Sequence, residues 1–107
     1  MKILIFSLFS IIPTIAFCQQ TGTTATQAEK ELLAGDISMQ KKNFEDAVSH
    51  YIKAINDDKD LTCGYVYRAK AYLGLHKQME ACQDLTTAKS KGCDRPELDD
   101  LMKNCEQ

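Results

Sequence analysis

Five cysteines and two histidines are the side chains of this sequence that could carry out metal or thiol chemistry. The histidines, His50 and His76, have no cysteine or carboxylate at the spacing of a recurrent metal-binding motif, and no Cys-x-x-Cys pair occurs. A metal or thiol site assembled from distant residues, such as Cys63, His76 and Cys93, is an alternative that the sequence leaves open. Surface positions for both histidines are the simpler interpretation. We therefore expect a protein without catalytic residues, metal or cofactor.

Whether the cysteines form disulfides or stay free thiols depends on the compartment of the protein. Residues 1–18 have the pattern of an export signal. One Lys precedes an apolar run that is shorter than the roughly 20 residues of a membrane-spanning helix. Small residues at Ala16 and Cys18 favour cleavage after Cys18, so we expect the mature protein to begin at Gln19. A lipoprotein anchored through Cys18 is the alternative, but Phe17 stands where a lipoprotein signal needs a small residue. The sequence thus predicts a periplasmic or secreted protein with no transmembrane span once it is mature.

The rest of the chain has room for one small domain. Residues 19–27 are polar, without apolar periodicity, and are expected to form a flexible tether. The formal net charge is -2, and basic residues are spread among acidic ones rather than gathered in a stripe. Nucleic acid is therefore not an expected partner.

An internal repeat of 34 residues organises the sequence from residue 28 onward. Small and large residues recur in the same order in both copies. The aligned pairs are Gly35 with Ala69, Ala47 with Ala81, Tyr51 with Leu85, and Ala54 with Ala88. A small residue on each of two helices lets their backbones cross closely, and a large residue one turn further fills the space beside the crossing. The pattern predicts two antiparallel helical hairpins.

These residues resemble the tetratricopeptide repeat family. The first copy, residues 28–61, also has Phe44 at the turn between helices, where the family usually has an aromatic residue. The second copy, residues 62–94, has Tyr72 in its first helix but Gln78 at that turn, and Lys59 replaces the proline that commonly ends the first repeat. The resemblance implies an all-α fold, a short α-solenoid of two hairpins.

In this family, the first helices of successive hairpins line a concave groove that holds peptides from partner proteins. The resemblance implies that six residues of this sequence line such a groove: Leu32, Asp36, Met39, Val66, Lys70 and Leu73. Some members hold the terminal carboxylate of a chaperone through asparagines and basic residues. Asp36 replaces the first such asparagine, so this activity is not implied here.

The expected helices span residues 28–42, 44–57, 62–75, 78–91 and 95–105. Gly92 suits the left-handed stop after the fourth helix, and Asp94 with Glu97 resembles a capping box for the fifth. One face of the fifth helix is apolar, formed by Leu98, Leu101, Met102 and Cys105. We expect residues 95–107 to cap the open end of the solenoid.

Helical geometry selects one pairing of the four mature cysteines, Cys63 with Cys93 and Cys82 with Cys105. Cys82 and Cys93 are about 16 Å apart along one helix, and Cys63 and Cys82 lie at opposite ends of an antiparallel hairpin. Both separations exceed the roughly 7 Å between the Cα atoms of a disulfide. The remaining pairing closes two loops, each worth roughly 3 to 4 kcal/mol in the chain-entropy model. Four buried free thiols are the alternative.

Without a catalytic motif, the repeat favours a protein-interaction or scaffolding module of the bacterial envelope. Its partner would be a protein or peptide bound on the concave surface. The alternative is a self-associating structural protein, because two repeats are fewer than the three or so that such arrays usually need. A metal or thiol activity based on Cys and His is the remaining hypothesis.

Overall fold

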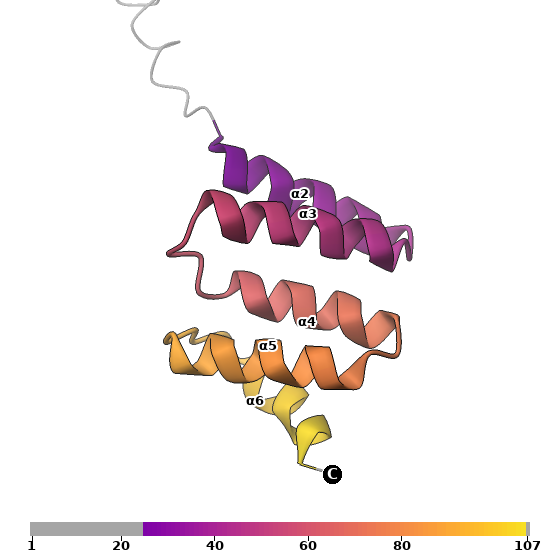
Figure 1. The fold of residues 1–107 in the computed structure, drawn as a ribbon, viewed down its shortest axis with the longest axis vertical. Coiled ribbons are helices and arrows are strands. Elements are labelled where there is room, and N and C mark those ends of the chain that lie inside the picture. Colours follow the sequence, from indigo (N-terminus) through magenta and orange to yellow (C-terminus); the bar gives the residue numbers. More distant parts are fainter. Residues whose placement is uncertain (1–24, 107) are drawn as a thin grey trace, which may run out of the picture.

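The computed structural model describes residues 25–106 and is helical throughout this range, which confirms the expected fold class (Figure 1). The helices are α2 (Gln27–Gln40), α3 (Phe44–Asp57), α4 (Gly64–Gly74), α5 (Gln78–Ser90), α6 (Glu97–Met102) and the 3₁₀ turn η1 (Lys103–Cys105). Antiparallel hairpins α2–α3 and α4–α5 stack through contacts between α3 and α4, and α6–η1 packs against α5. The result is a short helical-repeat solenoid. No helix in the described range is long and apolar enough to cross a membrane.

A capping box begins α2 one residue earlier than expected. The Thr26 hydroxyl accepts a hydrogen bond from the Glu29 amide (3.2 Å), and the Glu29 carboxylate accepts one from the Thr26 amide (2.7 Å). These bonds satisfy N–H groups that a helix start leaves open. The prediction of a flexible tether over residues 19–27 is therefore wrong for its last two residues. The export signal and residues 19–24 lie outside the described residues.

The turns of the two hairpins have the same geometry, 34 residues apart. Lys42 and His76 both have φ of 60°, in the left-handed region. In each turn, the next amide bonds back to a carbonyl of the first helix, Asn43 to Ser38 (2.8 Å) and Lys77 to Tyr72 (2.9 Å). The repeat in sequence is thus a repeat in backbone conformation.

The helices of the first hairpin cross closely at Gly35. The ring of Tyr51 lies directly over Gly35, and a Cβ atom built there would overlap the ring. Tyr51 is 1% exposed, and Ala47, one turn before it, is 0% exposed. At the same place in the second hairpin, Ala69 and Leu85 are both fully buried. The bulky ring of Tyr51 thus lies opposite a glycine in the first hairpin, and the smaller Leu85 lies opposite an alanine in the second.

The hydrophobic core consists of two clusters. The first joins the second hairpin to the C-terminal helix and contains Val66, Ala69, Ala81, Leu85, Ala88, Cys93 and Leu98. The second lies between the hairpins and contains Ala47, Tyr51 and Ala71, with partly buried side chains around them. The larger cluster therefore depends on residues that follow α5.

The C-terminal segment closes the solenoid but begins differently from the prediction. Leu98 is 3% exposed, as its place in the apolar stripe predicts. The helix begins at Glu97 rather than residue 95, and no side chain caps it. The predicted capping box is wrong because the Glu97 carboxylate binds Lys70 and Arg95 instead. Gly92 does adopt the left-handed conformation expected of it, with φ of 88°.

Two disulfides fasten this segment, with the connectivity that helical geometry predicts. Cys63, just before α4, is joined to Cys93, just after α5, with Cα atoms 5.1 Å apart. Cys82 on α5 is joined to Cys105 in η1, with Cα atoms 5.6 Å apart. The segment is therefore linked covalently to both parts of the second hairpin.

We predict that Gly35→Ala lowers the free energy of unfolding by about 1 to 2 kcal/mol, because overpacking outweighs the better helix propensity of alanine. Adding Tyr51→Leu reproduces the pair found in the second hairpin and should recover part of this loss. Chemical denaturation of both single variants and the double variant measures the coupling, expected at about 1 kcal/mol or more. A gain in stability from Gly35→Ala alone would contradict the close crossing.

Candidate partner-binding surface

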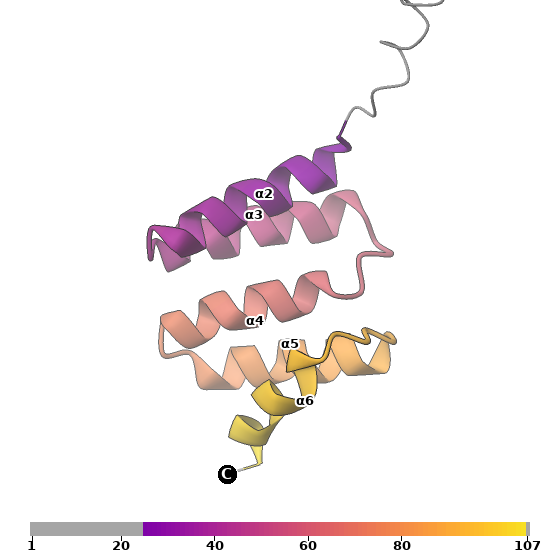
Figure 2. The same cartoon turned by 180° about the vertical axis from the view of Figure 1, so that it is seen from behind.

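The first helices of both hairpins lie on one side of the solenoid, together with α6 (Figure 2). We call this side the first-helix face. Three of the predicted groove residues are on α2. Leu32 and Met39 are half-buried and pack beside the cluster between the hairpins, whereas Asp36 between them is exposed. Spacings of four and three residues place all three on one stripe of α2.

The three predicted groove residues on α4 are less accessible. Val66 is 0% exposed within the core cluster that contains Leu98 of α6, so it offers no surface to a partner and its assignment is wrong. Leu73 packs against the same cluster. Lys70 donates to the Glu97 carboxylate over 2.6 Å. The chain's own C-terminal segment therefore occupies this stripe.

Aromatic and polar contacts connect the two stripes. The Tyr51 hydroxyl donates to Asp36 Oδ1 over 2.6 Å, and its ring stacks on Tyr67 of α4 with centroids 5.8 Å apart. Burial and the neighbouring carboxylate raise the pKa of Tyr51, which keeps the hydroxyl protonated as a donor. Asp36 is thus held in place from beneath and keeps an exposed face.

Arg95 continues this line to the C-terminal segment. Its guanidinium donates to the Tyr67 hydroxyl (2.6 Å), lies over the Tyr67 ring (5.0 Å to the centroid) and donates to Glu97 (3.0 Å). The hydrogen bonds from Lys70 and Arg95 lower the pKa of Glu97 to about 2. Lys70 and Arg95 share the single carboxylate of Glu97, whereas the Asp36 carboxylate accepts from the neutral Tyr51 hydroxyl.

Each hairpin also has a contact between a carboxylate and a nitrogen-bearing side chain of its two helices, with the carboxylate on the first helix in one hairpin and on the second helix in the other. In the first, Glu31 of α2 lies 2.8 Å from His50 of α3, and this hydrogen bond lowers the pKa of Glu31. In the second, Arg68 of α4 donates two hydrogen bonds, of 2.8 and 2.7 Å, to Asp84 of α5. His50 and Asp84 occupy equivalent repeat positions. These pairs connect the two helices of each hairpin.

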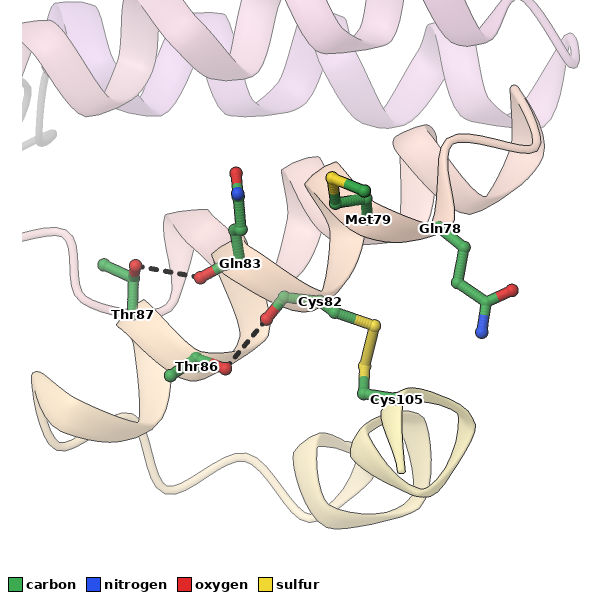
Figure 3. A pocket seen from close by; sticks show the side chains of 7 residues that line it. All are labelled: Gln78, Met79, Cys82, Gln83, Thr86, Thr87 and Cys105. Atoms are coloured by element: carbon green, nitrogen blue, oxygen red, sulfur yellow. Dashed lines mark hydrogen bonds between the residues drawn. A yellow bond between two sulfur atoms is a disulfide. The ribbon is translucent and has the colours of Figure 1, made fainter. Parts of the chain in front are cut away.

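A cavity of about 630 Å³ lies between α5 and η1 (Figure 3). Its lining is uncharged and consists of Gln78, Met79, Cys82, Gln83, Thr86, Thr87 and Cys105. The Cys82–Cys105 disulfide forms part of the wall, and Met79 is 74% exposed at its edge. This cavity was not predicted: six of its lining residues lie on α5, and Cys105 of η1 completes the wall.

The contacts of Tyr67, Arg95 and Glu97 were also missed by sequence reasoning. None of these residues belongs to the aligned pairs of the 34-residue repeat, and Arg95 and Glu97 lie outside the apolar stripe of the fifth expected helix. The sequence indicated these contacts only through residue type, because two basic groups, a carboxylate and a tyrosine can form hydrogen bonds wherever the fold brings them together.

The distant metal site considered from the sequence is not supported. Cys63 and Cys93 are bonded to each other, so they are not free ligands. His76 lies exposed in the turn between α4 and α5. Within residues 25–106, no group of three or more His, Cys, Asp or Glu side chains is arranged to hold a metal ion.

No family model matches the chain, and no solved structure matches it significantly. Over 66 residues, the chain is 39% identical to an Hsp70-Hsp90 organizing protein of Triticum aestivum. The match covers 61% of this chain but only 11% of that protein. The chain is thus similar to a short part of a much longer protein.

We predict that stability falls between about pH 4.5 and pH 2 as Glu97 becomes protonated. Its folded pKa of about 2 is below the ordinary value of 4.5, so its contribution is complete above pH 4.5 and is lost as the pH falls through the folded pKa. Chemical denaturation should show that wild type is more stable than Glu97→Gln above pH 4.5. This difference in the free energy of unfolding should shrink as the pH falls toward 2. Asp99→Asn, at a 78% exposed side chain, is the control. A constant wild-type advantage down to pH 2 would contradict the assigned contacts.

Proposed function

We propose that this protein is a non-enzymatic protein-interaction module of the bacterial envelope. On this proposal, it binds an extended or helical segment of a partner protein along the first-helix face. The observation that carries the proposal is the stripe of Leu32, Asp36 and Met39, in which an exposed carboxylate lies between two half-buried apolar side chains. Such a stripe offers apolar area for affinity and a charge for orientation.

The equivalent stripe on α4 supports this proposal because a segment of the same chain packs on it. Val66, Lys70 and Leu73 lie 34 residues after Leu32, Asp36 and Met39. They receive Leu98 in an apolar cluster and Glu97 in an ion pair. The sign of the charge is reversed on α2, where Asp36 replaces Lys70. A segment suited to α2 would therefore carry a basic side chain beside an apolar one.

Two further observations are consistent with this role. The similarity to an Hsp70-Hsp90 organizing protein, whose name describes it as organizing two other proteins, favours protein partners. The two disulfides favour an oxidising compartment, in line with export from the cytoplasm.

A randomised peptide library displayed against the oxidised protein tests the proposal. We expect selected peptides to share a Lys or Arg next to apolar residues. Asp36→Asn keeps an oxygen that can accept from Tyr51 but removes the charge. It should weaken binding of a selected peptide by about fivefold to tenfold, as expected for a partly exposed ion pair worth about 1 kcal/mol.

Asp57→Asn, at an exposed carboxylate on the end of α3, is the matched control and should bind as wild type does. Selected peptides rich in acidic residues, or equal affinity of the Asp36→Asn variant, would contradict binding at this stripe.

Self-association is a second candidate because α2 leaves two large apolar side chains in solvent. Leu33 is 62% exposed and Ile37 is 43% exposed, one helical turn apart. We expect a self-associating chain to show a sedimentation coefficient that rises with concentration, and Leu33→Gln with Ile37→Gln to abolish the rise. A concentration-independent monomer would exclude this candidate and leave the first untouched.

A further inference from the structure

The two disulfides differ in their surroundings. Cys93 is 8% exposed and belongs to the core cluster with Val66, Leu85 and Leu98, whereas its partner Cys63 is partly exposed. Cys82 and Cys105 are both partly exposed and line the cavity between α5 and η1 (Figure 3). Thiol–disulfide exchange needs a thiolate to reach a sulfur atom, so its rate depends on access. Both residues of the second disulfide are partly exposed, whereas one residue of the first is buried, so the geometry favours attack at the second.

The lining of the cavity presents no negative charge to a thiolate. None of its lining side chains carries a charge, so no carboxylate in the wall repels an incoming anion. The hydroxyls of Thr86 and Thr87 donate to the carbonyls of Cys82 and Gln83, each over 2.9 Å. The volume of about 630 Å³ lies within the range of pockets that accept small molecules or a few side chains.

We propose that Cys82–Cys105 is a site of thiol–disulfide exchange with a dithiol reductant, whereas Cys63–Cys93 is structural. A thiolate of the dithiol attacks one sulfur of the pair, the Cys82–Cys105 bond breaks, and the other cysteine leaves as a thiolate. The second thiol of the reductant then attacks the mixed disulfide. Two electrons and two protons pass to Cys82 and Cys105, and the reductant becomes a disulfide.

Reduction at this site changes what holds the C-terminal segment. Cys63–Cys93 still fixes the chain at residue 93, so release is confined to the residues after it. There, Leu98 packs in the core, Glu97 binds Lys70, and the Gln78 amide donates to the Asn104 carbonyl. A helix as short as α6 is not stable by itself, because helix nucleation is costly. Loss of the bond therefore loosens α6–η1 and uncovers the apolar side of α5.

Timed reduction of the oxidised full chain tests the proposal. The protein is treated with limiting dithiothreitol, free thiols are trapped at intervals with N-ethylmaleimide, and the remaining disulfides are reduced and labelled with iodoacetamide before peptide mapping. We expect the first label at Cys82 and Cys105 to appear at least about tenfold faster than at Cys63 and Cys93, because burial restricts attack. Equal rates, or faster labelling of Cys63 and Cys93, would overturn the proposal.

Substitutions in the cavity distinguish this site from general surface exposure. Gln83→Glu should slow reduction of Cys82–Cys105 severalfold by repelling the thiolate, and Gln83→Lys should accelerate it. Neither should change reduction of Cys63–Cys93. Equal rates in the two Gln83 variants would show that the cavity is not the route of attack.

Hydrogen exchange follows the structural consequence. After selective reduction, amides in residues 97–105 should exchange faster, whereas α2 and α3 should be unchanged. The double variant Cys82→Ser with Cys105→Ser should reproduce this pattern without reductant. Unchanged protection of residues 97–105 in both samples would overturn the proposed release.

Discussion

The close crossing of the two helices within each hairpin is the constraint on which the rest of the structure depends. At Gly35 the absence of a side chain lets the Tyr51 ring lie against the backbone of α2. The position of that ring then places its hydroxyl at Asp36 and its face against Tyr67. The same residue pair therefore determines the distance between α2 and α3, the contact between the hairpins, and the orientation of the carboxylate on the first-helix face. In the second hairpin Ala69 and Leu85 meet the same geometric demand with different volumes.

The C-terminal segment is the second determinant, because the larger core cluster is incomplete without Leu98. Two hairpins bury little apolar surface, and a protein with so small a core has a low free energy of unfolding. Here the interior is closed by a short helix, two disulfides and the contacts of Glu97 with Lys70 and Arg95. The same contacts fill the α4 stripe. The contacts that stabilise the core therefore also cover the stripe on α4, whereas the stripe on α2 stays partly exposed.

Local and repeated features could be predicted from the sequence. The repeat placed Gly35, Ala47 and Tyr51 at the crossing, and helix geometry allowed only one pairing of the four cysteines. The errors concern residues whose role depends on contacts outside the repeat. Glu97 was expected to cap its own helix, but two cations from α4 and the preceding loop bind it more favourably. Val66 was expected to face a groove, but a helix that the repeat pattern does not describe covers it. Thr26 and Glu29 form a local capping box, but the polar composition of residues 19–27 led to the prediction of a tether instead.

The opposite polarity of the two ion pairs within the hairpins bears on how the chain avoids misfolding. Two hairpins of similar sequence could exchange helices during folding, within one chain or between two copies. If α2 packed against α5 in the native register, Glu31 would approach Asp84, and if α4 packed against α3, Arg68 would meet His50. The first exchange brings two carboxylates together, with Asp84 only 6% exposed, and the second leaves Arg68 without its carboxylate partner. These contacts therefore favour the native pairing of helices within each hairpin, although both hairpins share the same pattern of small and large residues.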